Sequence, residues 1–428
     1  MEASYRLAST GVLGSPMLEN GGNQTHYFHI HPPVYYLGLS LMFKWCGFGI
    51  LQGKLFSLIL ALLALLVTCW ILIETKLSTP FQTFLLSILI TTTPLFFVIS
   101  KTIRPESLML LWWGLSYVLL HRWLMRKQTR YLIAGSLVNA LMMMTHFYGI
   151  PMVLLWMIEL LRRRDWKGIA LFGIIFTLAM APYLAWISTD WSAFYNQVII
   201  GRSITKIHLT DRPFILLHTL FFSKKIMWLW LFLLISALSM FRGKLTLLQK
   251  HLLFLSVTFV AQFLVLPKFN ELYFIVMLPV MLMGMLSLQQ SFPKRWILGA
   301  LLVFSTVNMG GLFLYVKEHR LFNYQAYSEQ ILKTMPKETQ GSILGRVSMY
   351  PIFHKNSFLA YEAFILPQDL TRIENAIRSA NYILVDDLPL DDRVLVAIIT
   401  NKHLASRFMS PAYGSEGTKR NNWISIYH

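Results

Sequence analysis

The stretch THYFHIHPPVYY, residues 25–36, gathers the side chains best suited to chemistry in this sequence. It holds three histidines and three tyrosines around Pro32 and Pro33, just before the first long apolar run. The second proline can begin a helix, because its missing N–H would have no helical partner there. In a purely structural interpretation, the tyrosines form an interfacial belt and the histidines are solvated.

A second candidate is the pair Arg104 and Glu106 in TIRPESLMLLWWGL, at the start of an apolar helix. Pro105 is ordinary near a helix start and a first-turn glutamate complements the helix dipole, so a capped helix with a surface ion pair explains the pattern. The functional interpretation is a carboxylate held at the membrane face, with Arg104 nearby to bind a phosphate or to orient the acid.

His146 ends another apolar run, in MMMTHFYGI. A single histidine at a helix end is usually structural. We predict it on the same side of the membrane as His29, His31 and Glu106, so a divalent metal held by a His/Glu cluster is geometrically open, although the spacing gives no metal signature. No cofactor follows with certainty from the sequence.

Lys268 and Tyr273 stand between two apolar runs in PKFNELYFIVMLP. A lysine at such a position can snorkel to the interface. It can equally meet the phosphate of a lipid-linked substrate, since a cation at the bilayer edge is costly without a partner. The loop that begins near residue 188 adds aromatic and basic side chains, which suit a sugar or a lipid headgroup but also an interfacial amphipathic helix. These residues are Asp190, Trp191, Tyr195, Arg202 and Lys206.

Composition places the chain among integral membrane proteins. Of 428 residues, 55% are hydrophobic and only 14% are charged, and the mean hydropathy is +0.53. The net charge of +18 does not indicate nucleic acid, because the basic residues form short clusters between apolar runs. The cysteines Cys46 and Cys69 lie in apolar surroundings and suggest neither a disulfide framework nor a metal site.

About ten segments are long and apolar enough to cross a bilayer, one of them short. They are residues 52–74, 81–99, 108–125, 131–148, 149–161, 168–187, 226–241, 251–267, 272–290 and 296–316. Basic clusters occupy alternate connections and mark them as cytoplasmic. The other connections carry the candidate residues above and are therefore extracytoplasmic. This topology also places the N-terminus outside, so we expect one further helix ahead of Met1, or direct insertion of the first hairpin.

Beyond residue 317 the pattern becomes that of a soluble domain. Helix signals in YSEQILKTM and LTRIENAIRSA alternate with strand signals in SILGRVSMY, NYILVDD and WISIYH. We therefore predict a transmembrane module at 1–317, with residues 1–51 as its first outer loop containing juxtamembrane helices, and a small extracytoplasmic α/β domain at 318–428.

Several motifs resemble, in order, those of the C-type membrane glycosyltransferases, particularly the protein O-mannosyltransferases and the lipid A aminoarabinose transferases. They are EASYRLASTGVL, YFHIHPPVYYLGLSLMF, IRPESLML and the KxxxxYFxxxLP pattern from Lys268 to Pro279. The likeness covers roughly residues 2–316. The sequence lacks the P-loop, GxGxxG, GxSxG and HExxH patterns of nucleotide-binding and hydrolytic enzymes.

The resemblance implies an inverting glycosyltransferase in the cytoplasmic (inner) membrane. It would move a hexose or pentose from a polyprenyl-phosphate donor to a lipid, glycan or protein acceptor at the extracytoplasmic face. In that family an Asp-Glu pair follows the first transmembrane helix; here Glu2 matches the second member and the first falls on Met1. We therefore expect a longer protein, an enzyme that relies on the remaining acids, or an inactive relative.

Within this resemblance, Glu2 and Glu106 are the predicted acid/base groups. The predicted substrate-binding residues comprise cations for the phosphate and aromatic or imidazole groups for the headgroup. They are Tyr27, His29, His31, Tyr35, Arg104, His146, Lys268 and Tyr273. The alternatives are a transporter or flippase for lipid-linked glycans, which predicts inverted repeats and broken helices, or an inactive polyprenyl-lipid-binding protein. The sequence shows no internal repeat.

The first prediction concerns His31, which stands where relatives often have a lysine before the proline pair. Histidine loses its charge near neutral pH, so donor affinity should weaken as pH rises from about 6 to 8. His31→Lys should remove this dependence. Equilibrium binding of the lipid donor across that pH range tests the assignment, and an unchanged profile in the original chain contradicts it.

Overall fold

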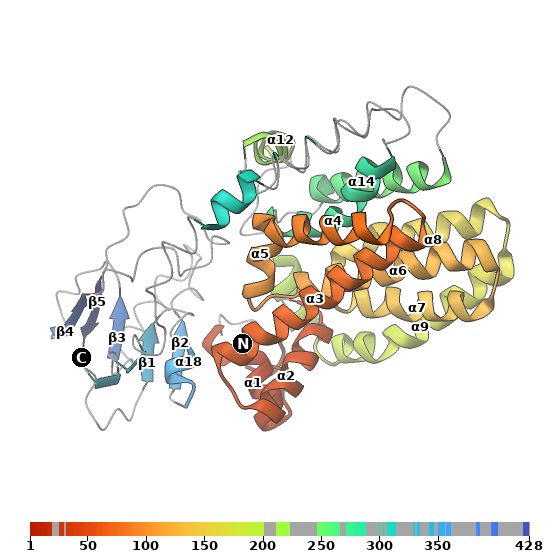
Figure 1. The fold of residues 1–428 in the computed structure, drawn as a ribbon. Helices are drawn as coiled ribbons and strands as arrows, with labels where there is room; N and C mark the ends of the chain where they lie inside the picture. Colours follow the sequence, from red (N-terminus) through yellow and green to blue (C-terminus); the bar gives the residue numbers. More distant parts are fainter. Residues whose placement is uncertain are drawn as a thin grey trace.

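The protein is described by a computed structural model (Figure 1). The structure describes residues 1–18, 25–29, 31–200, 211–222, 246–265 and 271–287, followed by shorter stretches. These are residues 299, 303, 306–313, 328–329, 332–333, 342–345, 350–355, 357–360, 382–385, 395–400 and 423–427. The predicted span at 226–241, most of the span at 296–316 and most of the two predicted C-terminal helices lie outside them.

Two short helices precede the bundle and pack against each other. Helix α1 (Glu2–Thr10) ends at Gly11, whose φ of 76° is left-handed and whose N–H bonds to the carbonyl of Leu7. The 3₁₀ turn η1 (Pro16–Leu18) follows. Helix α2 (Val34–Cys46) begins directly after Pro33, so the prediction that this proline opens a helix is confirmed.

The helices that follow form an antiparallel bundle (Figure 1), because each helix is joined to the next by a short turn. They are α3 (Ile50–Glu74), α4 (Pro80–Thr92), α5 (Pro94–Lys101), α6 (Glu106–Arg126), α7 (Thr129–Met143), α8 (Ile150–Arg162) and α9 (Trp166–Thr189). The turn η2 (Phe147–Gly149) joins α7 to α8, while α10 (Trp191–Phe194) and a π-helix (Tyr195–Ile200) follow α9. Later elements are α12 (Arg212–Phe222), α14 (Leu247–Val265), η4 (Glu271–Met277) and α15 (Leu278–Ser287).

Among the described residues, four helices are long and apolar enough to cross a membrane: α3, α6, α9 and α14. Helices α4 and α5 together would make a fifth, but they meet at an angle of 69°. Other predicted spans form shorter α-helices than expected. The span predicted at 131–148 ends at Met143 in α7, and the span predicted at 272–290 begins with a 3₁₀ helix from Glu271.

The bend corrects the prediction of one continuous helix over residues 81–99. Pro94 has no N–H to continue the α4 ladder, and Thr93 adopts an extended conformation with ψ of 133°. The Thr93 hydroxyl donates to the carbonyl of Ile90 at 2.8 Å and accepts from the N–H of Phe96 at 3.3 Å. The break is therefore capped by its own side chain.

A polar contact lies inside the bundle where α6, α7 and α8 meet. Ser116 accepts from Trp156 Nε1 at 2.9 Å and from Asn139 Nδ2 at 3.0 Å, and all three side chains are fully buried. Gly135 lets the Trp156 ring lie directly on the α7 backbone, since a Cβ atom there would collide with the indole. This packing fixes α8 against α7 beneath the turn that joins them.

At the arginine-rich end of the bundle, Glu159 of α8 joins α14 to the bundle. Its carboxylate lies 3.1 Å from His251 Nε2 and 2.7 Å from an Arg162 nitrogen. The other ring nitrogen of His251 lies 3.4 Å from the Tyr117 hydroxyl of α6. Since Glu159, His251 and Tyr117 are all buried, these contacts satisfy groups that would be costly to leave without partners.

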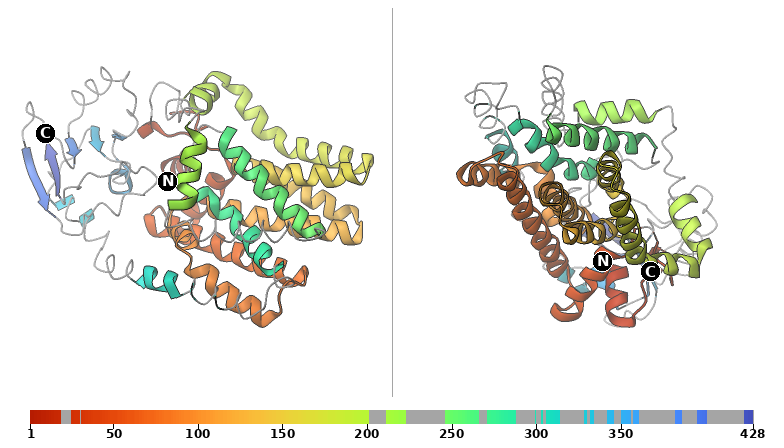
Figure 2. Two further views of the ribbon diagram at one scale, coloured as in Figure 1. Left: turned by 90° about the horizontal axis from the view of Figure 1, so that it is seen from above. Right: turned by 90° about the vertical axis from the view of Figure 1, so that its right-hand side faces the viewer.

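A five-stranded sheet lies beyond one end of the bundle in Figure 1 and in the view from above in Figure 2. The strands are β1 (Ser342–Gly345), β2 (Ser357–Ala360), β3 (Tyr382–Val385), β4 (Leu395–Thr400) and β5 (Trp423–Tyr427). Their order is β2-β1-β3-β5-β4, with β2-β1-β3 parallel and β5 antiparallel to both neighbours. Strands β1, β3 and β5 fall within predicted strands; the extent of the C-terminal domain stays a prediction.

Helix α18 (Tyr350–Phe353) brings this C-terminal part onto the N-terminal helices. The His354 ring lies 5.2 Å from the Tyr5 ring of α1 and 4.7 Å from the Phe48 ring, between centroids. Strand β2 also contacts η1. The contact between the two ends of the chain is therefore largely aromatic.

The second prediction tests the close approach of α7 and α8. Gly135→Ala should lower the free energy of unfolding by about 1–3 kcal/mol, because the added methyl group must displace the buried Trp156 ring. Gly173→Ala is the matched control, since nothing lies within 4 Å of a Cβ atom at that helical glycine. Thermal unfolding in detergent micelles measures both, and equal midpoints would contradict the packing described.

Candidate active site

Glu106 and Arg104 form a buried, forked ion pair at the first turn of α6. Arg104 Nε donates to both carboxylate oxygens at 2.9 and 3.1 Å, and Arg104 Nη2 donates to Oε1 at 2.6 Å. The Glu106 side chain is only 3% exposed and that of Arg104 is 20% exposed, so this is no surface ion pair. These three hydrogen bonds fix the orientation of the carboxylate as well as its position.

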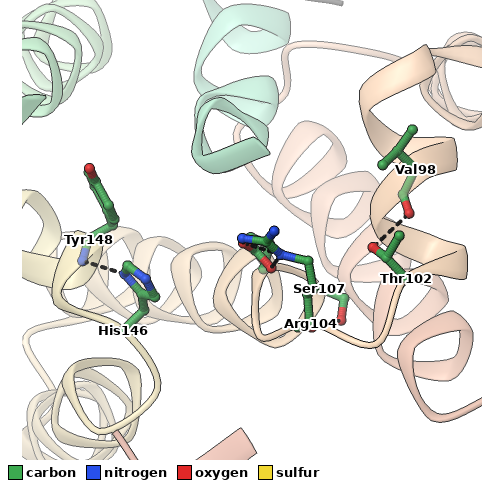
Figure 3. Close-up of polar contacts among 7 residues, drawn as sticks. Val98, Thr102, Arg104, Ser107, His146 and Tyr148 are labelled. Carbon is green, nitrogen blue, oxygen red and sulfur yellow. Dashed lines mark hydrogen bonds and ion pairs between the residues drawn. The ribbon is translucent and has the colours of Figure 1, made fainter. Parts of the chain in front are cut away.

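The backbone around this pair is also fixed (Figure 3). The Thr102 hydroxyl donates to the carbonyl of Val98 at 2.9 Å, and the Ser107 hydroxyl lies 3.5 Å from the Arg104 carbonyl. Pro105 is the N-cap residue of α6, and the carboxylate of Glu106 therefore lies at the positive end of a 21-residue helix.

Tyr35 connects α2 to this ion pair. It is 1% exposed, and its hydroxyl lies 3.0 Å from the Ser57 hydroxyl of α3. Burial raises the pKa of the Tyr35 phenol, the Ser57 hydrogen bond lowers it, and the nearby charges of Glu106 and Arg104 act in opposite directions. The phenol therefore stays protonated beside the carboxylate at neutral pH, available for hydrogen bonding.

The turn that holds His146 is anchored by two tryptophans of α6. Trp112 Nε1 donates to the Thr145 hydroxyl at 3.1 Å, and Trp113 Nε1 donates to the carbonyl of Tyr148 at 3.2 Å. Within the turn, the N–H of Tyr148 donates to His146 Nδ1 at 3.3 Å. The helix that begins with Glu106 thus also fixes the histidine turn, whose His146–Tyr148 contact is drawn in Figure 3.

From the opposite side, α14 contributes one further anchor. Gln262 Nε2 donates to the carbonyl of Phe147 at 2.8 Å, and Gln262 is buried. The amide therefore ties the start of η2 to a helix more than a hundred residues further along the chain. Sequence reasoning missed this residue, although a glutamine within the apolar run LSVTFVAQFLV was a visible signal.

His31, His146, Tyr148 and Tyr273 form one group of rings next to this turn. The ring centroid of His146 lies 5.6 Å from His31, 5.0 Å from Tyr148 and 4.7 Å from Tyr273. Tyr148 and Tyr273 lie 4.4 Å apart. The structure thus brings together residues predicted from three separate segments, and the group is half-buried at His31 and buried elsewhere.

Tyr36 links this ring group to Tyr35. Its ring lies 6.3 Å from that of His31 and 5.7 Å from that of Tyr35, between centroids, and Tyr35 lies within the electrostatic range of Glu106 and Arg104. In addition, η4, which carries Tyr273, packs against both α5 and α6. Ring contacts therefore run from Tyr35 to the two histidines.

His29 occupies a different environment from His31. Its ring is fully buried, 4.3 Å from Trp186 and 5.7 Å from both Phe194 and Tyr27, between centroids. Neither ring nitrogen has a hydrogen-bond partner among the residues that the structure describes. Burial lowers the pKa of His29 to about 4, against a smaller opposing effect from Asp190. His29 is therefore neutral at pH 7.

Glu2, the other predicted acid, is buried in α1 and accepts a hydrogen bond from the Ser15 hydroxyl. Its charge also acts on Tyr350 of α18, where burial is the largest of the effects that raise the pKa of the phenol. Glu2 therefore lies at the contact between the N-terminal helices and the C-terminal part. Lys268 lies outside the described residues, and its role stays a prediction.

The described residues do not form a metal site. Among the described parts of the chain, no three His, Cys, Asp or Glu side chains are grouped closely enough to share an ion. The His31 ring lies against that of Tyr36, and the His146 ring lies against that of Tyr273. A divalent cofactor stays an untested prediction.

These features define a helical protein with several apolar helices and, at one end of the bundle, a carboxylate–arginine pair beside histidines and tyrosines. Residues 30–188 match the family model described as dolichyl-phosphate-mannose-protein mannosyltransferase. This segment includes His31, Tyr35, Arg104, Glu106 and His146. The family resemblance predicted from the sequence is thereby confirmed.

Two solved structures are similar in fold. ArnT from Cupriavidus metallidurans bound to undecaprenyl phosphate gives a TM-score of 0.61 at 11% identity, covering 100% of this chain and 92% of that chain. The apo state of the same protein gives a TM-score of 0.56 at 12% identity, covering 100% of this chain and 91% of that chain. No curated protein matches the sequence.

The third prediction follows from the lowered pKa of His29. The unfolded chain takes up a proton at this histidine near pH 6.5 and the folded chain only near pH 4, so stability should fall as pH decreases through this window. At pH 5 the loss should be about 2 kcal/mol.

The measurement is thermal unfolding in micelles at pH 7, 6 and 5, compared between variants. His29→Phe preserves a ring in the aromatic surroundings and should flatten the pH dependence, whereas the exposed His26→Ala should leave it unchanged. Parallel curves for the original chain and His29→Phe would show that this histidine does not titrate as described.

Proposed function

We propose that this protein is a membrane glycosyltransferase that moves a sugar from a polyprenyl-phosphate donor to a nucleophilic acceptor. The observation that carries the proposal is the buried, forked Arg104–Glu106 pair at the start of α6, the helix that also anchors the turn of His146. The family match over residues 30–188 supports it, as does the fold shared with a protein whose structure holds undecaprenyl phosphate. The donor would enter from the membrane.

In this proposal Glu106 is the general base. An acceptor hydroxyl or amine attacks the anomeric carbon, the bond between that carbon and the phosphate oxygen breaks, and its electron pair leaves with the polyprenyl phosphate. The acceptor's proton goes to the Glu106 carboxylate. Because attack occurs opposite to the leaving phosphate, the configuration of the anomeric carbon inverts. Such base catalysis contributes about 10²- to 10⁴-fold.

Arg104 has a double role in this scheme. Two of its nitrogens engage Glu106, which orients the carboxylate before substrate binds. An arriving phosphate competes with the carboxylate for the guanidinium, and a carboxylate thus released is better able to accept a proton. His31 and the predicted Lys268 would share the phosphate charge, while Tyr27, Tyr35 and Tyr273 would line the headgroup site.

The proposed orientation places this site on the extracytoplasmic side of the cytoplasmic membrane, together with the C-terminal domain. The basic clusters at the other end of the bundle support it, since helices α6 and α8 end at Arg126 and Arg162. Glu2 is retained as a second acid, held by Ser15 at the contact with α18. The acceptor would be a lipid, a glycan or a protein.

A transporter is the alternative that one observation favours, because the α4–α5 break resembles the broken helices of transporters. Thr93 satisfies the backbone groups at this break, however, and the side chains flanking it are uncharged. A broken helix that coordinates a substrate would instead leave carbonyl or N–H groups for it. The geometry therefore favours transfer over translocation.

The fourth prediction is that Glu106→Gln lowers transfer by at least about 10²-fold, since the amide keeps the shape of the side chain but cannot accept the proton. The assay uses proteoliposomes with undecaprenyl-phosphate-linked mannose and a panel of other hexosyl and pentosyl analogues, and measures release of undecaprenyl phosphate.

Glu74→Gln provides the matched control. Glu74 accepts forked hydrogen bonds from Arg122 at 3.0 and 3.1 Å at the other end of the bundle, so it tests the loss of a similar pair. It should retain activity. Full activity of Glu106→Gln would refute the assignment of the base, and movement of intact donor across the bilayer without release would favour the transporter.

A further inference from the structure

Gln197 reaches from the π-helix that follows α10 to the first outer loop. Its Nε2 donates to the carbonyl of Tyr27 at 2.6 Å, and its Oε1 accepts from the N–H of His29 at 2.7 Å. The two partners lie 170 and 168 residues away in the sequence. One buried amide thus pairs with the backbone as a neighbouring strand would, on both its donor and acceptor sides.

The helix that carries Gln197 is unusual. Residues Tyr195–Ile200 form a π-helix, a conformation that is rare and often found at functional sites. It continues α10, whose start is capped by Asp190: the carboxylate accepts from the N–H of Ala193 at 2.8 Å. The position of Gln197 is therefore set by a capped turn on one side and a widened helix on the other.

The side chain of His29 belongs to the same contact. While its N–H bonds to Gln197, its ring packs between Trp186 of α9 and Phe194 of α10. The titratable groups that face it are Asp190, from the junction of these helices, and Tyr27, from its own segment. We call the two hydrogen bonds that join Gln197 to Tyr27 and His29 the clamp. The clamp and the aromatic packing of the ring both act on His29.

His31 lies between two backbone anchors. Before it, Gln197 holds the backbone at Tyr27 and His29; after it, the N–H of Val34 donates to the carbonyl of Met144 at 3.0 Å. Met144 belongs to the same turn region as His146. The Val34–Met144 hydrogen bond links the loop directly to the His146 turn. The hydrogen bonds to Gln197 set the path of the backbone that leads to His31.

We propose that Gln197 is a positioning residue that sets the placement of His31 against His146. The inference rests on the proposed function, because that function gives the two histidines their role beside the donor headgroup. Without the clamp, the backbone from Tyr27 to His29 loses both hydrogen bonds to Gln197 and keeps the one from the Phe28 N–H to the Leu13 carbonyl, so His31 is held less tightly on that side. Donor binding should weaken more than the chemical step.

The fifth prediction compares Gln197→Leu, Gln197→Glu and the exposed control Ser192→Ala on the same loop. In purified full-length chain, hydrogen exchange of peptides covering residues 25–36 should accelerate by about tenfold or more in Gln197→Leu, since a buried hydrogen bond protects the His29 amide. Ser192→Ala should match the original chain, and unfolding curves show whether each variant is folded.

Gln197→Glu separates positioning from simple packing. The ionised carboxylate accepts from His29 but repels the Tyr27 carbonyl, whereas the protonated acid can donate to it again. Measured relative to the original chain at the same pH, exchange in 25–36 and affinity for undecaprenyl phosphate, used as the probe, should therefore recover as pH falls from about 8 to 6. Gln197→Leu should show no such recovery.

The outcomes are distinct. Unchanged exchange in a folded Gln197→Leu, or a Gln197→Glu variant with no pH recovery, overturns the inference. Faster exchange together with at least about tenfold weaker binding of undecaprenyl phosphate supports it. If exchange responds as expected but the original chain releases no sugar from any donor, then the proposed function fails while the clamp on the loop is retained.

Discussion

The forked hydrogen bonds from Arg104 to Glu106 are the interaction on which the candidate site depends. A carboxylate that is 3% exposed at the edge of an apolar bundle is costly unless it is paired and hydrogen-bonded. The pair satisfies this requirement within a tripeptide, and Pro105 places the carboxylate at the positive end of α6. The same helix then extends past Trp112 and Trp113, which hold the His146 turn. One element therefore fixes both the acid and one histidine, and their relative position does not depend on the longer loops.

The longer loops instead determine the position of His31, and two neutral side chains hold the segments next to the histidines. Gln197 and Gln262 each bind backbone atoms of a histidine-bearing segment, and both glutamines are buried. Charged anchors at these points would compete with Arg104 and Glu106 for partners and would carry a larger desolvation cost. A glutamine amide offers both N–H donors and a carbonyl acceptor, so it can bond the N–H and C=O groups of the backbone without changing the local charge. The charge near the ring group therefore stays with the residues proposed for chemistry.

Much of this arrangement could be predicted from the sequence. Apolar runs and basic clusters predicted α3, α6, α9 and most of α14, and helix polarity placed Glu106 and His146 at the same end. The polar contacts between distant segments could not be predicted, because hydropathy contains no information on which loop a glutamine meets 168 residues away. His29 illustrates the limit. Residues 29 and 31 would share one face of a regular strand, but this segment is not a strand, and the two rings turn to different neighbours.

His29 and His31 differ in the groups that pack against their rings. Trp186, Phe194 and Tyr27 offer rings but no hydrogen-bond acceptor close to the His29 nitrogens, so this histidine is held neutral and serves as an apolar ring. His31 is half-buried and lies against a second histidine and a tyrosine. A phosphate would favour the charged form of His31 and have little effect on His29. The aromatic packing around His29 thus provides a neutral support for the segment, and the chemistry of the loop is confined to its neighbour two residues on.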